Sequence, residues 1–117
     1  MTELEFHIHP TKSAFAIATL RGHITGGLQA VEFASNINRL IASNIKCVVL
    51  DLSGVTLMNS SGLGMLVGGM TTMRKAGGAM RFAAIPANVM HLLEITRLNT
   101  VFDIYESVDA ALQNDPS

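Results

Sequence analysis

A continuous apolar run from Lys46 to Leu52 limits the folds open to this chain more than any other feature. It contains two adjacent valines, and the only charged residues are Lys46 at its start and Asp51 near its end. Such a segment is typical of a strand buried on both faces, as found in sheets covered by helices. The sequence from Leu52 to Met73 then holds no charged residue at all. We therefore expect an α/β fold with this strand at the middle of its sheet.

Apolar residues elsewhere recur at strand or helix spacing. Pro10 is expected to end the first strand, and a short turn after it would pair the first two strands antiparallel. The strands are expected at residues 4–9, 14–20, 46–52, 79–85 and 101–105. The helices are expected at residues 28–42, 60–75, 86–95 and 108–112.

The order ββαβαβα with a short C-terminal helix predicts a mixed β-sheet with helices mainly on one face. Right-handed crossovers place successive helices on the same side of a sheet. The 117 residues contain no repeat or linker. A chain of this length buries about two-thirds of its unfolded surface, so we expect a single domain over residues 1–117.

Charge and composition exclude several classes of protein. The net charge is -1 and the isoelectric point is about 6.4, without the clustered basic residues that nucleic-acid binding requires. Residues 1–5 are acidic and lack the order of a signal peptide. The uncharged stretch at residues 52–73 has five glycines and many hydroxyl groups, which argues against membrane insertion. We expect a cytoplasmic protein.

The cysteine and the histidines give no support for a metal or cofactor site. Cys47 lies in the apolar run, where a buried structural thiol is expected. His7 and His9 alternate with apolar residues and should face solvent. A metal shared with His23 would need a carboxylate or cysteine pattern that the sequence lacks.

The segment from Asp51 to Gly64 carries the candidate chemistry. We expect it to run from the buried strand, through a loop, into a helix. Small polar residues at 59–61 can accept hydrogen bonds from the free N–H groups of that helix. Gly62 and Gly64 each weaken a first turn by roughly 1 kcal/mol relative to alanine, so an ordinary cap does not explain them. We interpret them as leaving the serines uncovered for another molecule.

Two enzymatic interpretations of this segment are weak. A hydrolase nucleophile at Ser61 would need a glycine two residues earlier, where Asn59 stands, and no spacing ties His23 or His91 to Ser61. A dinucleotide-binding loop starting at Gly62 would need a glycine at Val67.

The same segment resembles the STAS domains of anti-sigma-factor antagonists and of sulphate transporter tails. Members carry Asp-Leu-Ser, a few residues, then Asp-Ser-Ser-Gly-Leu-Gly, and residues 51–53 and 59–64 match this at the same spacing. Residues 22–25 resemble the family's Gly-x-Leu-Asp, and residues 93–98, 102–105 and 110–112 resemble its C-terminal end. The resemblance covers nearly the whole chain, and it implies a binding module that is not an enzyme.

In antagonists of this family the second serine of the pair is phosphorylated by an anti-sigma kinase. By position this role falls on Ser61, with Ser60 as the fallback. The resemblance implies that the unmodified protein binds the kinase and frees the sigma factor, and that a phosphatase resets the switch. The kinase supplies ATP and magnesium, so no cofactor is expected here.

Two departures bear on this function. The family's acidic residue before the serines is Asn59 here, and its acidic residue after the second strand is Thr25. If those carboxylates orient the hydroxyl or aid the kinase, phosphorylation is slower or lost. A STAS subunit without a switch, such as an accessory protein of a lipid-exporting ABC transporter, then remains as the alternative, with Ser61 only a contact or a cap.

We expect the partner to contact the loop before the helix and the exposed face of the helix itself. Met65, beside Gly69 and Thr72, would add an adaptable contact. The residues predicted for this surface are Met58, Asn59, Ser60, Ser61, Gly62, Met65, Gly69, Thr72 and Thr25.

Overall fold

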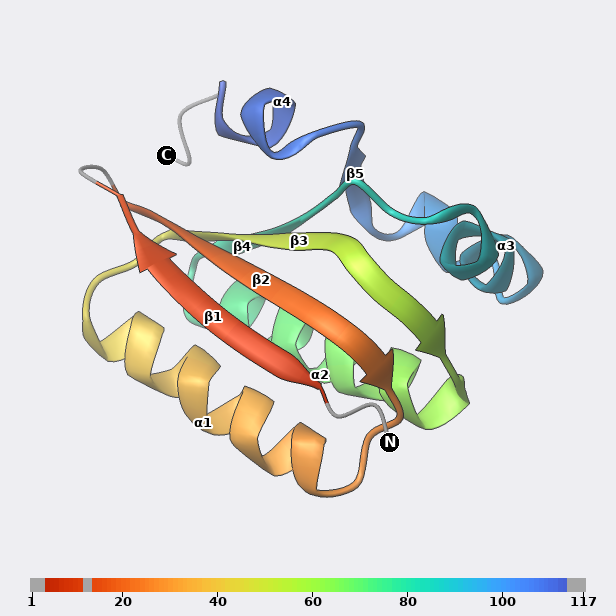
Figure 1. The fold of residues 1–117 in the computed structure, drawn as a ribbon. Helices are drawn as coiled ribbons and strands as arrows, with labels where there is room; N and C mark the ends of the chain where they lie inside the picture. The colour runs from red at the N-terminus through yellow and green to blue at the C-terminus, as the bar shows by residue number, and fades with distance from the viewer. Residues whose placement is uncertain (1–3, 12–13, 114–117) are drawn as a thin grey trace.

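The five strands form one mixed sheet in which their order in space is their order in the sequence. The first two strands are antiparallel, and all later neighbours are parallel. The computed structural model describes residues 4–11 and 14–113 (Figure 1). The strands are β1 (Glu5–Pro10), β2 (Phe15–Ile24), β3 (Cys47–Met58), β4 (Ala79–Ala83) and β5 (Asp103–Tyr105). The helices are α1 (Leu28–Ala42), α2 (Ser60–Lys75), α3 (Ala87–Ile95), the 3₁₀ turn η1 (Leu98–Thr100) and α4 (Val108–Leu112).

The main core lies between the sheet and the helices of one face. In Figure 1, α1 and α2 lie side by side across this face, and α4 lies on the other. Phe33 of α1, Leu66 of α2 and Phe82 of β4 are buried in this core, and α3 adds Val89 and Leu93. Each parallel crossover moves on to the next strand in the same direction, so right-handed crossovers place these helices on one side. The expected mixed sheet with helices mainly on one face is confirmed.

The opposite face carries a smaller core around a buried arginine, which the sequence analysis did not anticipate. Arg81 is 8% exposed, and its Nη1 donates to the carbonyl oxygen of Ala111 at 2.6 Å. Its guanidinium lies 5.3 Å from the ring centre of Phe15 and 5.5 Å from that of Tyr105. Its Nε is 3.7 Å from an Asp103 carboxylate oxygen. Arg81 therefore ties α4 to the sheet.

Two strands are longer than expected, which removes the predicted loop. The expected ends were Leu20 and Leu52, but β2 continues to Ile24 and β3 to Met58, where these two residues pair. Gly22, with φ of 103°, lies where the register between the strands shifts, so β2 passes an irregularity and then resumes. Only one residue, Asn59, separates β3 from α2.

Smaller differences from the expected elements lie near the two ends of the chain. β5 is shorter than the strand expected at residues 101–105. The turn expected after Pro10 lies partly outside the described residues, as does most of the acidic N-terminal segment. His7 and His9 are exposed on β1, as expected. Within the described ranges, no helix has both the length and the apolar character that a membrane span requires.

Cys47 is fully buried under α4, as expected, and should make stability depend on pH in alkali. Burial, and to a lesser degree the Asp103 carboxylate, raise the pKa of the thiol from 9.0 to about 11, and Arg81 opposes this shift. The folded state thus keeps a proton that the unfolded state has lost. This contribution is fully present below pH 9 and is lost as the pH rises through about 11.

The test compares the free energy of unfolding of wild type and Cys47→Ala, measured with urea from below pH 9 to above pH 11. We expect the stability advantage of wild type over the variant to shrink as the pH rises. A constant difference between the two proteins would contradict the predicted role of the thiol.

Candidate functional site

The start of α2 follows directly on the end of β3, and Asn59 caps it. Asn59 has extended backbone angles, and its Oδ1 accepts a hydrogen bond from the Gly62 N–H at 2.8 Å. This satisfies one of the free N–H groups of the first turn. Ser60 and Ser61 are the first two helical residues, and both are exposed. Of the three predicted capping residues, Asn59 thus makes the cap and leaves the two serines in the first turn.

Gly62 is required because the end of β2 lies against this turn. A Cβ atom at Gly62 would lie 2.0 Å from the carbonyl oxygen of Ile24, a distance no side chain can adopt. The same oxygen accepts a hydrogen bond from the Asn59 N–H at 3.2 Å. Nothing lies within 4 Å of a Cβ built at Gly64. Gly62 is therefore required for close packing inside the protein. The sequence analysis interpreted both glycines as leaving the serines uncovered, and this interpretation holds for Gly64 alone.

The loop between β2 and α1 lies against Ser61. Gly26 has φ of 82°, and a Cβ built on it would come within 2.9 Å of the Cβ of Ser61. The Gln29 side chain holds this loop: its Oε1 accepts from the N–H of Thr25 at 2.8 Å and of Gly26 at 3.2 Å. Its Nε2 donates to the carbonyl oxygen of His23 at 3.0 Å. The loop is thus a braced rim beside the serine.

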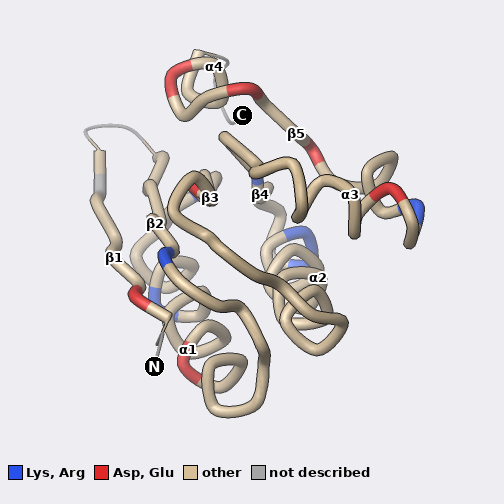
Figure 2. The backbone as a smooth tube through the Cα atoms, turned by 45° about the vertical axis from the view of Figure 1, so that its right-hand side comes forward, with Lys and Arg blue, Asp and Glu red and all other residues tan. Residues whose placement is uncertain are grey.

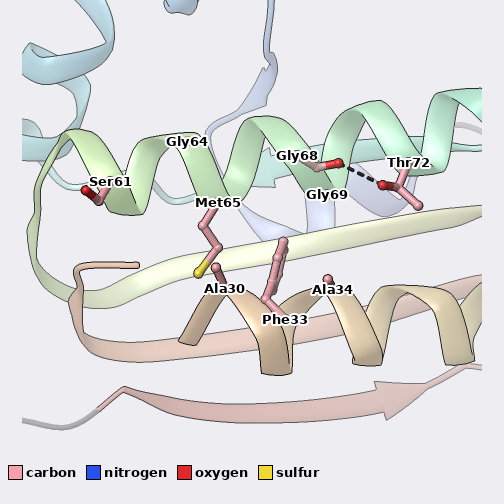
Figure 3. Close-up of a pocket in the computed structure, with 9 residues that line it drawn as sticks. All are labelled: Ala30, Phe33, Ala34, Ser61, Gly64, Met65, Gly68, Gly69 and Thr72. Carbon is pink, nitrogen blue, oxygen red and sulfur yellow. Dashed lines mark hydrogen bonds between the residues drawn. The ribbon is translucent and has the colours of Figure 1, made fainter. Parts of the chain in front are cut away.

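A groove of about 390 Å³ runs between α1 and α2, with Ser61 at one end (Figure 3). Met65 and Phe33 point into the space between the two helices, and Thr72 lies at the far end, where its Oγ1 donates to the Gly68 carbonyl at 2.9 Å. Most of the residues that line the groove are small. They are Ala30, Phe33, Ala34, Ser61, Gly64, Met65, Gly68, Gly69 and Thr72.

The structure brings most of the predicted partner surface together, with three corrections. Gly62 was predicted for this surface, but it is buried against the end of β2. Thr25 is exposed in the loop beside Ser61, Met58 is half-buried at the end of β3, and Thr72 is half-buried in the groove. Met65 and Gly69 were expected on an exposed helix face. Met65 is only 6% exposed and Gly69 is buried, because α1 packs against this side of α2.

Sequence reasoning missed the contribution of α1 to this surface. Ala30, Phe33 and Ala34 supply one wall of the groove, and Gln29 braces the loop at its end. The spacing of apolar residues predicted an amphipathic helix at residues 28–42, but it did not indicate that this helix contributes to a binding surface. The adjacent glycines at 26 and 27 were the one available signal, since such a pair permits a close approach of two backbones.

The two segments that carry Ser61 and the loop beside it are uncharged. The segments at residues 22–31 and 52–73 contain no Lys, Arg, Asp or Glu. Arg74 and Lys75 lie in the last turn of α2, and Figure 2 shows blue at that end of the helix. At a rise of about 1.5 Å per residue they are roughly 20 Å from its first turn. The free N–H groups give the first turn a partial positive charge, which stabilises an anion by about 0.3 to 1 kcal/mol.

This geometry suits a hydroxyl that another protein modifies or binds. Ser61 is exposed, stands at a helix start that tolerates an added anion, and faces a groove open to a partner. Ser60 is also exposed but is not among the residues that line the groove. The arrangement therefore favours Ser61 over Ser60.

The model of the STAS domain matches residues 10–111 of the sequence. This match covers most of the chain and includes both helices of the groove and the whole 51–64 segment. The chain belongs to the STAS domain family.

Known proteins similar to this chain include antagonists and a transporter protein. The anti-sigma-B factor antagonist of Bacillus subtilis is 31% identical over 62 residues, which is 53% of this chain and 57% of that protein. An anti-sigma factor antagonist from Mycobacterium paratuberculosis has 21% identity and a TM-score of 0.78, over 94% of this chain and 92% of that one. Bacillus SpoIIAA in its phosphorylated form has 14% identity and a TM-score of 0.70, over 92% and 96%. A sulfate transporter family protein from Wolinella succinogenes has 15% identity and a TM-score of 0.76, over 89% and 86%.

Proposed function

We propose that this chain is an anti-sigma-factor antagonist whose Ser61 is phosphorylated by a partner kinase in the cytoplasm. The observation that carries the proposal is the exposed Ser61 hydroxyl, held in the first turn of α2 at the end of an uncharged groove. Similarity to the B. subtilis antagonist supports the role, and similarity to SpoIIAA in its phosphorylated form supports the modification.

In the proposed step the chain is a substrate, and the kinase supplies the catalysis. The Ser61 Oγ attacks the γ-phosphorus of ATP held by the kinase with magnesium. The bond from that phosphorus to the leaving oxygen of ADP breaks, and the serine proton passes to a base of the kinase. A separate phosphatase would hydrolyse the phosphoserine and return the hydroxyl.

The neutral residues Asn59 and Thr25 do not remove the features on which the proposal rests. Asn59 keeps the capping hydrogen bond to Gly62 through its amide oxygen. Thr25 keeps its place in the loop because its own N–H is bound by Gln29. The backbone around Ser61 is therefore held without either carboxylate.

The proposal predicts where phosphate goes. The protein is incubated with anti-sigma-type kinases of its own organism and Mg-ATP, and the phosphate is mapped by mass spectrometry. We expect phosphate on Ser61, full loss of transfer in Ser61→Ala, and retained transfer in the matched variant Ser60→Ala, because only Ser61 lines the groove. Phosphate on Ser53 or Thr56, with Ser61→Ala still fully modified, would contradict the assignment.

A second candidate is a STAS subunit without a switch. This second candidate is supported by the structural similarity to a sulfate transporter family protein. No transfer to any serine by any of these kinases would support this candidate against the antagonist.

A further inference from the structure

The braced loop between β2 and α1 connects one side chain of α1 to the candidate phosphorylation site. We infer that Gln29 is a positioning residue, which fixes the backbone around Ser61 so that a kinase meets a preformed surface. The part of this inference that concerns the kinase rests on the proposed function.

Gln29 fixes the residues on both sides of Ile24. Its Nε2 donates to the His23 carbonyl at 3.0 Å, and its Oε1 accepts from the Thr25 N–H at 2.8 Å. A third hydrogen bond, from the Gly26 N–H at 3.2 Å, extends the brace to the next residue. One amide group therefore sets the orientation of the peptide units around Ile24.

The Ile24 carbonyl passes this orientation to α2. It accepts the Asn59 N–H at 3.2 Å, and it occupies the space that a side chain at Gly62 would need. Asn59 in turn caps the helix through the Gly62 N–H at 2.8 Å. The path from Gln29 to the first turn of α2 thus consists of hydrogen bonds and one close contact.

The loop also touches the serine directly. Gly26 is buried, and its position against the Cβ of Ser61 leaves no room for a side chain. If the loop moves, both Ser61 and the rim beside it lose their fixed placement. A partner would then have to order the loop on binding, which weakens association without changing the chemistry of transfer.

The test uses Gln29→Met, which keeps the length of the side chain and removes its amide, and Gln29→Glu, which keeps an acceptor oxygen for the two N–H groups. Asn36→Ala is the matched control, because the Asn36 amide donates to the Glu32 carbonyl at 2.9 Å, within α1 and away from the loop. Amide hydrogen exchange, measured by NMR on the protein alone, reports the loop and the first turn of α2.

We expect Gln29→Met to speed exchange at Thr25, Asn59 and Gly62 by about tenfold or more, with the sheet centre unchanged. Gln29→Glu should fall between Gln29→Met and wild type, and Asn36→Ala should match wild type. With the kinase, Gln29→Met should raise KM severalfold and leave kcat unchanged. A loss of global stability alone would not produce this pattern.

Unchanged exchange at Asn59 and Gly62 in Gln29→Met would overturn the inference, even if Ser61 is phosphorylated normally. Faster exchange with an unchanged KM would overturn the part that concerns the kinase. If wild type is not phosphorylated at all, the proposed function fails, while the exchange data still decide whether Gln29 positions the site.

Discussion

Gly62→Ala is expected to lower the melting temperature of this protein by about 10 to 20 °C. The added methyl group would lie 2.0 Å from the Ile24 carbonyl oxygen and 2.6 Å from its carbon, so the strand end or the helix start has to move. Overpacking of this kind costs about 2 to 3 kcal/mol. Because the displaced backbone carries Ser61, phosphorylation should slow as well. Thermal unfolding followed by circular dichroism measures the effect.

Gly64→Ala is the matched control, one half-turn along the same helix. Nothing lies within 4 Å of the added methyl group, and alanine is the better helix former. This variant should be about 0.5 to 1 kcal/mol more stable than wild type. Equal melting temperatures for the two alanine variants would show that the contact at Gly62 does not restrict the site.

Phosphorylation of Ser61 is expected to weaken binding to the kinase-type partner by on the order of a hundredfold. A phosphate adds about 1.5 to 2 negative charges at pH 7. The nearest cations along α2 are Arg74 and Lys75, at its other end. Against one partner carboxylate about 6 Å away, at an effective dielectric constant near 30, the repulsion is roughly 3 kcal/mol before salt screening. The helix dipole stabilises the phosphate by only about 0.3 to 1 kcal/mol, and this stabilisation is the same in the free and bound states.

Calorimetry on four forms of the protein tests this switch. Ser61→Ala should bind like unmodified wild type, Ser61→Asp should bind at least severalfold more weakly, and the phosphorylated protein should bind most weakly. Added salt should reduce the differences, since they arise from charge. Equal affinities for all four forms would remove the switch and favour the constitutive STAS subunit.

The fold was largely predictable because its strongest patterns are local. The buried run around Val48 and Val49 places the central strand, and the apolar spacing of residues 28–42 and 60–75 places the two main helices within a residue of their observed ends. The end of β3 was not predictable in this way. Ser53 and Thr56 read as loop residues, but they are solvent-facing positions of a strand whose Val55 is buried.

The candidate site was predictable in its serines and not in what surrounds them. Asn59, Ser60 and Ser61 lie together because they are adjacent in the sequence. The placement of Met65 depends instead on the contact between α1 and α2, and the role of Arg81 depends on the Ala111 carbonyl, which is distant in the sequence. The partners of Gln29 are close in the sequence, but its hydrogen bonds depend on how the chain turns between β2 and α1. Long-range contacts of single side chains leave no periodic pattern, so the sequence carries no sign of them.

The direct junction of β3 and α2 also has a consequence for the phosphorylation proposed above. Many kinases draw a flexible segment into their active-site cleft, but here a single residue joins a paired strand to a capped helix. Ser61 cannot leave this surface without breaking the end of the sheet. On the proposed function, the recognition unit is therefore the folded domain rather than a linear motif, and a kinase would have to approach the serine where it stands.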